Sequence, residues 1–213
     1  LEGTTPGSQF GWSAGFLPSP DDSLLRVAIS SPDFDSKRGL VQAFEINKSD
    51  GTWYQIGNDL LGEAQGDQFG FSLATSSDKA TLAVGAPQCE NTLGCVSVYD
   101  WNERAVDWDL VESTNIRGDK KKDKFGRSVA ISKNGNRVAA ASIHHDGLSG
   151  LVRVFDLDDT SSSTSLTEVG KMAGGVRLSQ FGSSLAMNED GTMLVVGSSG
   201  SKNTAGQVVG SVQ

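Results

Sequence analysis

The 213-residue sequence is poor in the residues that most metal centres and histidine-dependent catalytic sites use, with only 2 His and 2 Cys. It also lacks any apolar run near the ~18 residues needed to cross a bilayer, so we expect no transmembrane segment. The 26 acidic residues outnumber the 18 basic ones and give a formal net charge of −8. Nucleic acids bind basic surfaces, so we expect no nucleic-acid partner. Nothing in the composition indicates a cofactor.

What the sequence does contain is a repeat. A Phe-Gly pair occurs four times, with its Phe residues spaced by 59, 56 and 56 positions: Phe10, Phe69, Phe125 and Phe181. A serine follows each Phe by three positions, and a glycine opens an alternating segment later in each copy: Gly39, Gly94, Gly150 and Gly206. We therefore divide the chain into repeats at about 8–66, 67–122, 123–178 and 179–213, the last incomplete, within a single domain or part of one.

Each repeat is predicted to form four short strands. In the second repeat the first three are residues 71–75, the apolar run 81–84 and the alternating segment 94–101, and residues 108–111 form the fourth. We expect the apolar second strands to be the most buried segments. No stretch keeps helical periodicity over ten residues. The pattern predicts an all-β fold, a β-propeller built of four-stranded blades with a period of about 56 residues.

The second repeat carries a family resemblance, in Trp53, Gln55, Gly57, Phe69-Gly70 and Gly85-Ala86-Pro87. With these motifs the chain resembles, over nearly its whole length, the FG-GAP repeats of integrin-α-type β-propellers, in particular a short bacterial and algal variety. The resemblance implies the propeller fold and says almost nothing about function.

Calcium-binding members of that family carry a loop of alternating oxygen ligands between the Phe-Gly pair and the Gly-Ala-Pro run. Here three of the repeats leave 16 residues between these landmarks, as from Phe69 to Gly85, which is too short for such a loop. The longer first repeat has prolines in place of carboxylates. We therefore interpret Asp190-Gly191 as a hairpin turn in preference to a calcium site, and we expect no metal ion.

The two cysteines, Cys89 and Cys95, flank five residues of one loop between a second and a third strand. Such a hairpin neck favours a disulfide over two free thiols, and a disulfide would indicate an oxidising compartment, either extracellular or the lumen of an organelle. Asn47 begins an Asn-Lys-Ser sequon in a polar turn, where either a glycan or a chance match explains it.

The same type of loop holds the candidate partner-binding residues: Asp33, Asp35, Glu90, His144, His145 and Asp146. Their carboxylates are interpreted as distinct to single repeats and scattered over separate loops. His144 and His145 are expected to be solvated loop residues in preference to a ligand site or a pH sensor.

Two further motifs have ordinary structural explanations. Arg117-Gly118-Asp119 is the tripeptide that integrins recognise, but a glycine turn before a solvated lysine run also accounts for it. Trp53, Trp101 and Trp108 fall on predicted outer strands, where packing between blades is favoured over a carbohydrate platform.

Two function classes remain. The first is a non-catalytic scaffold that presents loops to a protein or glycan, or that serves as a subunit of a larger assembly. The alternative is a propeller-type glycan-active enzyme, a hydrolase or lyase, with its site at the central channel. Such an enzyme needs convergent carboxylates, so binding is favoured and no catalytic residue is assigned. Because the chain ends within a third strand, we expect part of a longer propeller, with a closed four-bladed ring as the alternative.

Overall fold

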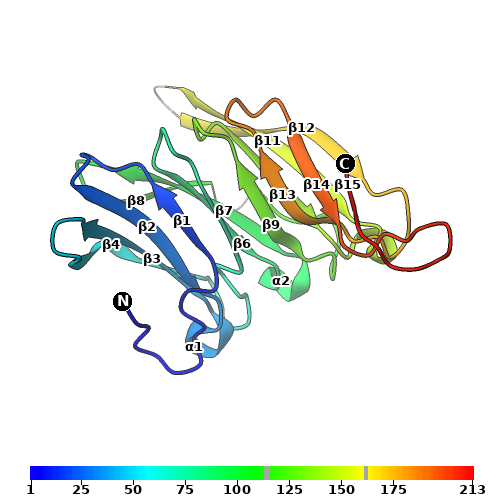
Figure 1. The fold of residues 1–213 in the computed structure, drawn as a ribbon, viewed down its shortest axis with the longest axis horizontal. Coiled ribbons are helices and arrows are strands. Elements are labelled where there is room, and N and C mark those ends of the chain that lie inside the picture. The colour runs from blue at the N-terminus through cyan, green and yellow to red at the C-terminus, as the bar shows by residue number, and fades with distance from the viewer. Residues whose placement is uncertain (113–115, 161–162) are drawn as a thin grey trace.

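The computed structural model describes residues 1–112, 116–160 and 163–213 and is all-β (Figure 1). Three four-stranded antiparallel sheets follow one another along the chain, each with its strands in sequence order. Sheet 1 contains β1 (Ala14–Leu17), β2 (Leu24–Ser31), β3 (Leu40–Asn47) and β4 (Trp53–Leu61). Sheet 2 contains β5 (Ser72–Thr75), β6 (Thr81–Ala86), β7 (Cys95–Asn102) and β8 (Asp107–Glu112). Sheet 3 contains β9 (Phe125–Ile131), β10 (Arg137–Ser142), β11 (Leu151–Thr160) and β12 (Ser163–Ala173).

Sheet 4 departs from this pattern. Its strands in the described chain are β13 (Phe181–Met187), β14 (Leu194–Ser198) and the short β15 (Ser211–Val212). Ser198 pairs with Ser211, whereas the equivalent Ser142 of sheet 3 pairs with Leu151, which corresponds to Gln207. The third strand expected to start after Gly206 therefore begins four residues later.

A local turn explains this shift in sheet 4. The side-chain carbonyl of Asn203 accepts hydrogen bonds from the backbone N–H groups of Ala205 and Gln207, both at 3.0 Å. An isolated bridge between Lys202 and Val208 closes the small hairpin. These local bonds satisfy backbone groups that would otherwise pair with β14.

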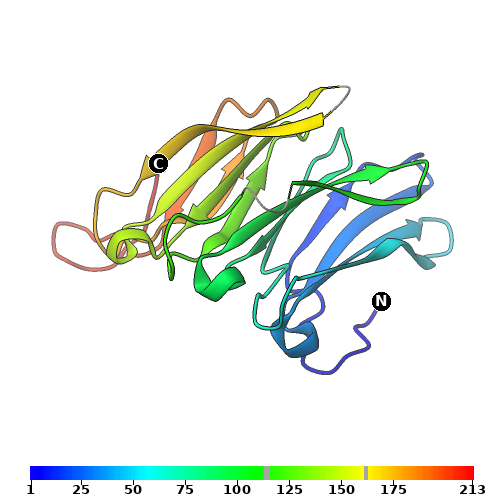
Figure 2. The ribbon, with the colours of Figure 1, turned by 180° about the vertical axis from the view of Figure 1, so that it is seen from behind.

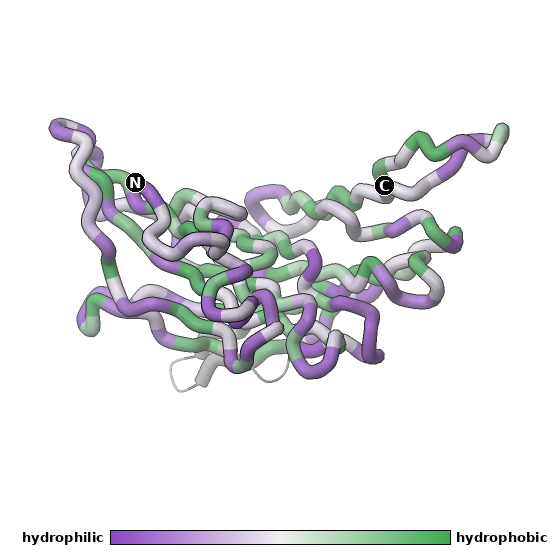
Figure 3. The backbone as a smooth tube through the Cα atoms, turned by 90° about the horizontal axis from the view of Figure 1, so that it is seen from below, coloured by the Kyte–Doolittle hydropathy of each residue, from purple (hydrophilic) through white to green (hydrophobic). Residues whose placement is uncertain are grey.

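The sheets form an open arc. Strands β1, β5, β9 and β13 contact one another in succession and lie toward the viewer in Figure 1, whereas β4, β8 and β12 lie on the opposite side, seen in Figure 2. The view from below in Figure 3 shows the sheets side by side, with the two termini at opposite ends of the row. The first strands therefore line the inner side of the arc.

A separate apolar core fills each boundary between neighbouring sheets. At the boundary of sheets 1 and 2, Ala28 and Val41 pack with Leu82 and Val84. All six residues of β6 are buried, as are five of the six in β10, which confirms the expected burial of the second strands. Strand β14 is the exception because only one of its faces has a neighbouring sheet.

The Phe-Gly pairs join adjacent sheets. Phe69 N–H donates to the Arg38 carbonyl at 3.2 Å, and the same bond recurs from Phe125 to Leu93. Gly39 lies so close to Phe69, at φ +87°, that a Cβ would overlap the Phe69 carbonyl oxygen. The Phe-Gly pair of one repeat and the glycine before the third strand of the preceding repeat therefore contact each other across the sheet boundary.

Candidate functional site

Three one-turn helical segments connect the second and third strands of sheets 1 to 3. They are α1 (Phe34–Lys37), α2 (Cys89–Thr92) and α3 (His145–Leu148). In Figures 1 and 2 they lie along the same edge of the arc. The candidate loop residues from the sequence therefore come together on one edge, which we call the turn edge.

The backbone of these segments is left-handed. In α1, Asp35, Ser36 and Lys37 have φ values of 47°, 56° and 67°. The equivalent residues of α2 and α3 have the same sign of φ, although only Gly147 among them is a glycine. A left-handed conformation costs an ordinary L-residue roughly 1–2 kcal/mol, so each turn carries backbone strain.

Hydrogen bonds from both the same sheet and the next one hold this strained geometry. Gly39 N–H donates to Phe34 O at 3.0 Å and closes the α1 turn, as Gly94 does to Cys89 O in α2. Gln68, which precedes the next Phe-Gly pair, donates its N–H to Lys37 O at 2.8 Å. The turns are therefore rigid as a result of the inter-sheet contact.

A carboxylate occupies the first left-handed position of every turn: Asp35, Glu90 and Asp146. The sequence interpretation of these acids as features of single repeats was wrong, since they are equivalent residues. Glu90 pairs with Arg117 at 2.6 Å, Asp35 accepts a hydrogen bond from Gln65 at 3.3 Å, and Asp146 is exposed. The turn edge thus repeats one carboxylate in three sheets, each beside basic side chains: Arg38 lies 4.0 Å from Asp35, Arg117 pairs with Glu90, and Lys121, Lys122 and Arg177 line the same surface as Asp146.

The other loop candidates have structural partners. Asp33 accepts a hydrogen bond from Gln68 Nε2 at 3.3 Å. The two histidines are part-buried, which corrects the expectation of solvated side chains. His145 Nδ1 contacts Asp123 Oδ2 at 2.7 Å. Burial lowers the pKa of His144, and the nearby cations Lys124 and Arg127 lower it further.

Two buried carboxylates were missed from the sequence. Asp67 and Asp123 stand two residues before the Phe of their repeats, where Ser8 and Ser179 occupy the terminal repeats, and all four are buried. Burial raises the pKa of Asp67, and Glu90 raises it further. The available signal was that two polar residues precede every Phe-Gly pair: Ser8-Gln9, Asp67-Gln68, Asp123-Lys124 and Ser179-Gln180.

Cys89 and Cys95 form the expected disulfide, with their Cα atoms 5.7 Å apart. Both are buried within the core between sheets 1 and 2. The bridge therefore ties the α2 turn to the start of β7 at a sheet boundary.

Both charged residues of the Arg117-Gly118-Asp119 tripeptide are engaged. Arg117 pairs with Glu90, and Asp119 contacts Lys171 at 2.6 Å and Arg153 at 3.3 Å. The tripeptide is therefore built into sheets 2 and 3. The sequon residue Asn47 ends β3 and accepts hydrogen bonds from Ser49, in the polar turn that was expected.

Of the tryptophans, Trp101 and Trp108 pack edge to face, with ring centroids 5.2 Å apart, against Gly57 of sheet 1. Packing between sheets is thus confirmed for these two. Trp53 instead lies on the outer face of sheet 1 beside Phe44 and remains 38% exposed.

Asp190 makes a hairpin turn, accepting hydrogen bonds from the Thr192 N–H at 3.0 Å and hydroxyl at 2.6 Å. Within the described ranges, no group of three or more His, Cys, Asp or Glu side chains is arranged to hold a metal ion. Nor does any helix there have the length and apolar character to span a membrane.

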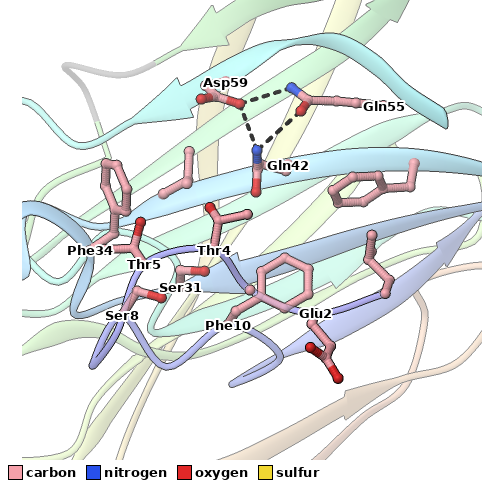
Figure 4. A pocket seen from close by; sticks show the side chains of 14 residues that line it. Glu2, Thr4, Thr5, Ser8, Phe10, Ser31, Phe34, Gln42, Gln55 and Asp59 are labelled. Atoms are coloured by element: carbon pink, nitrogen blue, oxygen red, sulfur yellow. Dashed lines mark hydrogen bonds between the residues drawn. The ribbon is translucent and has the colours of Figure 1, made fainter. Parts of the chain in front are cut away.

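A hollow of about 420 Å³ lies on the face of sheet 1 that points away from sheet 2 (Figure 4). Gln42, Gln55 and Asp59 form a hydrogen-bonded triangle on one side of it, with distances of 2.8–3.1 Å. Its apolar floor includes Leu40 and Phe44, whose equivalents Cys95 and Tyr99 in sheet 2 pack against sheet 1. The hollow therefore lies between this sheet face and the N-terminal segment, whose Phe10 packs edge to face on Phe44 with ring centroids 6.2 Å apart.

No family model and no curated protein matches the sequence. Solved structures do resemble the fold. Hydrazine synthase from Kuenenia stuttgartiensis superposes with a TM-score of 0.53 at 17% identity, over 100% of this chain and 48% of that chain. TolB from Acinetobacter baumannii gives a TM-score of 0.47 at 14% identity, over 94% and 43%. These neighbours are β-propeller proteins. At such identities the likeness shows the fold alone, and this chain spans about half the length of either neighbour.

Proposed function

We propose that this chain is a non-catalytic interaction module, a set of FG-GAP-like propeller blades that presents the turn edge to a protein partner in an oxidising compartment. The observation that carries this proposal is the threefold repetition of a left-handed turn on one edge, in which eight of the nine left-handed residues are not glycine. Strained backbone that the surrounding structure holds in place is concentrated at functional sites. A rigid turn also lowers the entropy that a loop loses on binding.

The net charge of the chain favours a basic partner, and the carboxylates of the turn edge, which lie beside basic side chains, are the groups that such a partner would compete for. Asp35, Glu90 and Asp146 repeat along the edge, and the whole chain has a net charge of −8. Complementary charge speeds association and selects partners even where it adds little affinity. The Cys89–Cys95 disulfide supports the extracellular or lumenal assignment.

The described residues offer little support for catalysis at this edge. The closest acid–base pair is His145 with Asp123, but no Ser or Cys in the described part of the chain hydrogen-bonds the other ring nitrogen of His145. A nucleophile–base–acid arrangement requires such a contact.

Cross-linking capture from the secreted fraction of the source organism tests the proposal. The test variant D35N/E90Q/D146N neutralises the turn edge. The matched control D22N/E103Q/E189Q neutralises three exposed acids in the turns after first and third strands. Each set removes two contacts to basic side chains: the test variant removes Glu90 with Arg117 and Asp35 with Arg38, and the control removes Glu103 with Arg26 and Glu189 with Lys133.

We expect one partner to be captured by the wild type and the control, and at least tenfold less by the turn-edge variant. Equal capture by both variants would overturn the assignment to the turn edge. Sustained release of reducing sugar from a glycan array by the wild type would overturn the non-catalytic assignment.

A further inference from the structure

A second candidate surface lies away from the turn edge, on the inner side of the arc. A groove of about 380 Å³ runs across the first strands of the four sheets. Its first row consists of the residues that directly follow the Phe-Gly pairs: Trp12, Phe71, Arg127 and Ser183. The repeat thus brings four different side chains into one row.

Three of these side chains pack against one another, with the Trp12 and Phe71 rings tilted by 55°. The ring centroids of Trp12 and Phe71 are 5.3 Å apart, and the guanidinium of Arg127 lies over the Phe71 ring at 4.1 Å from its centroid. Trp12 Nε1 donates a hydrogen bond to the Phe71 carbonyl at 2.9 Å, which fixes the indole orientation. Because Trp12 is still 48% exposed, it presents part of its ring to the groove.

Arg127 is a part-buried cation without an anion. Other arginines on the sheets meet carboxylates: Arg137 contacts Asp156 at 2.6 Å, and Arg153 contacts Glu168 at 2.5 Å. For Arg127, no carboxylate of the described residues lies within ion-pair distance. Burial lowers its pKa, with no anion to oppose that effect. The guanidinium therefore has unused donors in a fixed fork, the geometry that recognises a carboxylate.

The surroundings of Arg127 are locally positive despite the acidic chain. Lys124 and Arg127 are two cations at the start of sheet 3, and both add to the effect of burial in lowering the pKa of His144, which favours its neutral form. The nearby Asp123 is engaged by His145. This corner complements an anion.

The second row of the groove consists of hydroxyl groups: Ser13, Ser72, Ser128 and Ser184. Ser72 and Ser128 donate to the carbonyls of Gly126 and Gly182 at 2.8 and 2.5 Å. Since their hydrogens are committed, the free lone pairs of these oxygens accept hydrogen bonds. A simple anion has no donor for these serine oxygens, whereas the hydroxyl groups of a sugar can donate hydrogen bonds to them.

We propose that this groove binds a carboxylate-bearing saccharide of the hexuronate class, with Arg127 holding the carboxylate and Trp12 stacking on the sugar ring. The C–H edges of a pyranose are weakly positive and match the negative face of an indole. Arg127 provides a bidentate contact, and the serine oxygens accept from ring hydroxyls. The groove is shallow and open across four strands, as binding of an extended chain requires. This proposal is independent of the partner at the turn edge.

Titration with D-galacturonate and trigalacturonate tests the proposal, with D-galactose, acetate and phosphate as the comparison ligands. Calorimetry gives the affinity, and the ¹⁵N-labelled indole signal of Trp12 reports contact in the unmutated chain. Variants R127Q and W12A probe the two contacts, and R104Q is the control because Arg104 lies in an exposed turn of sheet 2. Thermal unfolding of each variant verifies that it is folded.

We expect galacturonate to shift the Trp12 indole signal and to bind at least tenfold more tightly than galactose, acetate or phosphate. R127Q should weaken binding at least tenfold, W12A several-fold, and R104Q not at all. Equal affinity for galactose, or unchanged affinity in folded R127Q, would overturn the role of Arg127. Equal affinity for acetate or phosphate would overturn the saccharide assignment. If R127Q does not fold, the absence of an indole shift in the wild type would itself refute the proposal.

Discussion

Strands β6 and β14 occupy the same place in their repeats, yet their burial differs sharply. Every residue of β6 is buried, whereas Val195 in β14 is 50% exposed. The equivalent of Val195 in sheet 2 is Ala83, which is fully buried although alanine is the less apolar residue. Apolar character alone therefore does not decide burial here. The burial of a second strand depends on whether another sheet packs against each of its faces, as in other stacked repeats.

In the first sheet the N-terminal segment takes the place of a neighbouring sheet. Leu40 and Phe44 are buried beside this segment, with Phe10 edge to face on Phe44, while their equivalents Cys95 and Tyr99 pack against a core that contains Phe69. A boundary between two sheets combines a glycine before the third strand of one sheet, such as Gly39, with the Phe-Gly pair of the next sheet, such as Phe69-Gly70. The predictions below compare such boundaries with the uncovered faces.

The largest effect is expected at the Phe of the Phe-Gly pair. Phe125 is fully buried between sheets 2 and 3, whereas Phe10, which packs on sheet 1 alone within residues 1–213, is only part-buried. We expect F125A to lower the free energy of unfolding by about 3–5 kcal/mol, the usual cost of removing a buried phenylalanine. F10A should cost less than half of that. Urea unfolding of both variants measures the difference.

A matched substitution makes this comparison strict, because the residue type and the repeat position are the same in both variants. Equal losses at Phe10 and Phe125 would show that the Phe-Gly pair acts within its own sheet, against the inter-sheet role described above.

An intermediate effect is expected from the disulfide, which only the boundary between sheets 1 and 2 has among the described residues. Reduction of Cys89–Cys95 should lower the free energy of unfolding by about 2 kcal/mol, the loop-entropy value for a short closed loop. Urea unfolding with and without a phosphine reductant measures it. Hydrogen exchange should rise in β7 but not in β11, which has no bridge. Unchanged stability after verified reduction would contradict this prediction.

The sequence predicted the strands and the sheet boundaries well because each landmark has one physical cause repeated several times. Phe69 needs the space beside Gly39, so both recur with the same period. The left-handed turns could not be predicted, because Asp35, Ser36 and Lys37 have no glycine to indicate a positive φ. Their conformation depends on hydrogen bonds from the next sheet, which a local pattern does not contain. The shifted β15 was missed for the opposite reason, since a local Asn203 turn replaced the repeat geometry.

The smallest effect distinguishes a carboxylate at a sheet boundary from one on an exposed turn. Burial, followed by Glu90, raises the pKa of Asp67, so the folded chain binds that proton more tightly than the unfolded chain does. The contribution of Asp67 to the free energy of unfolding therefore falls as pH rises from its ordinary value near 3.9 through the raised one. Hydrogen bonds from Thr192 lower the pKa of the exposed Asp190, so its contribution has the opposite sign and is lost as pH falls through that lowered pKa. Urea unfolding from pH 3 to 7 measures both effects. As pH rises, the stability of D67N should increase relative to the wild type, and that of D190N should decrease relative to the wild type. Asn at position 67 keeps an acceptor for the Ala64 N–H, so the comparison isolates the charge. Curves for D67N and the wild type that stay parallel would show that Asp67 titrates as it does in the unfolded chain.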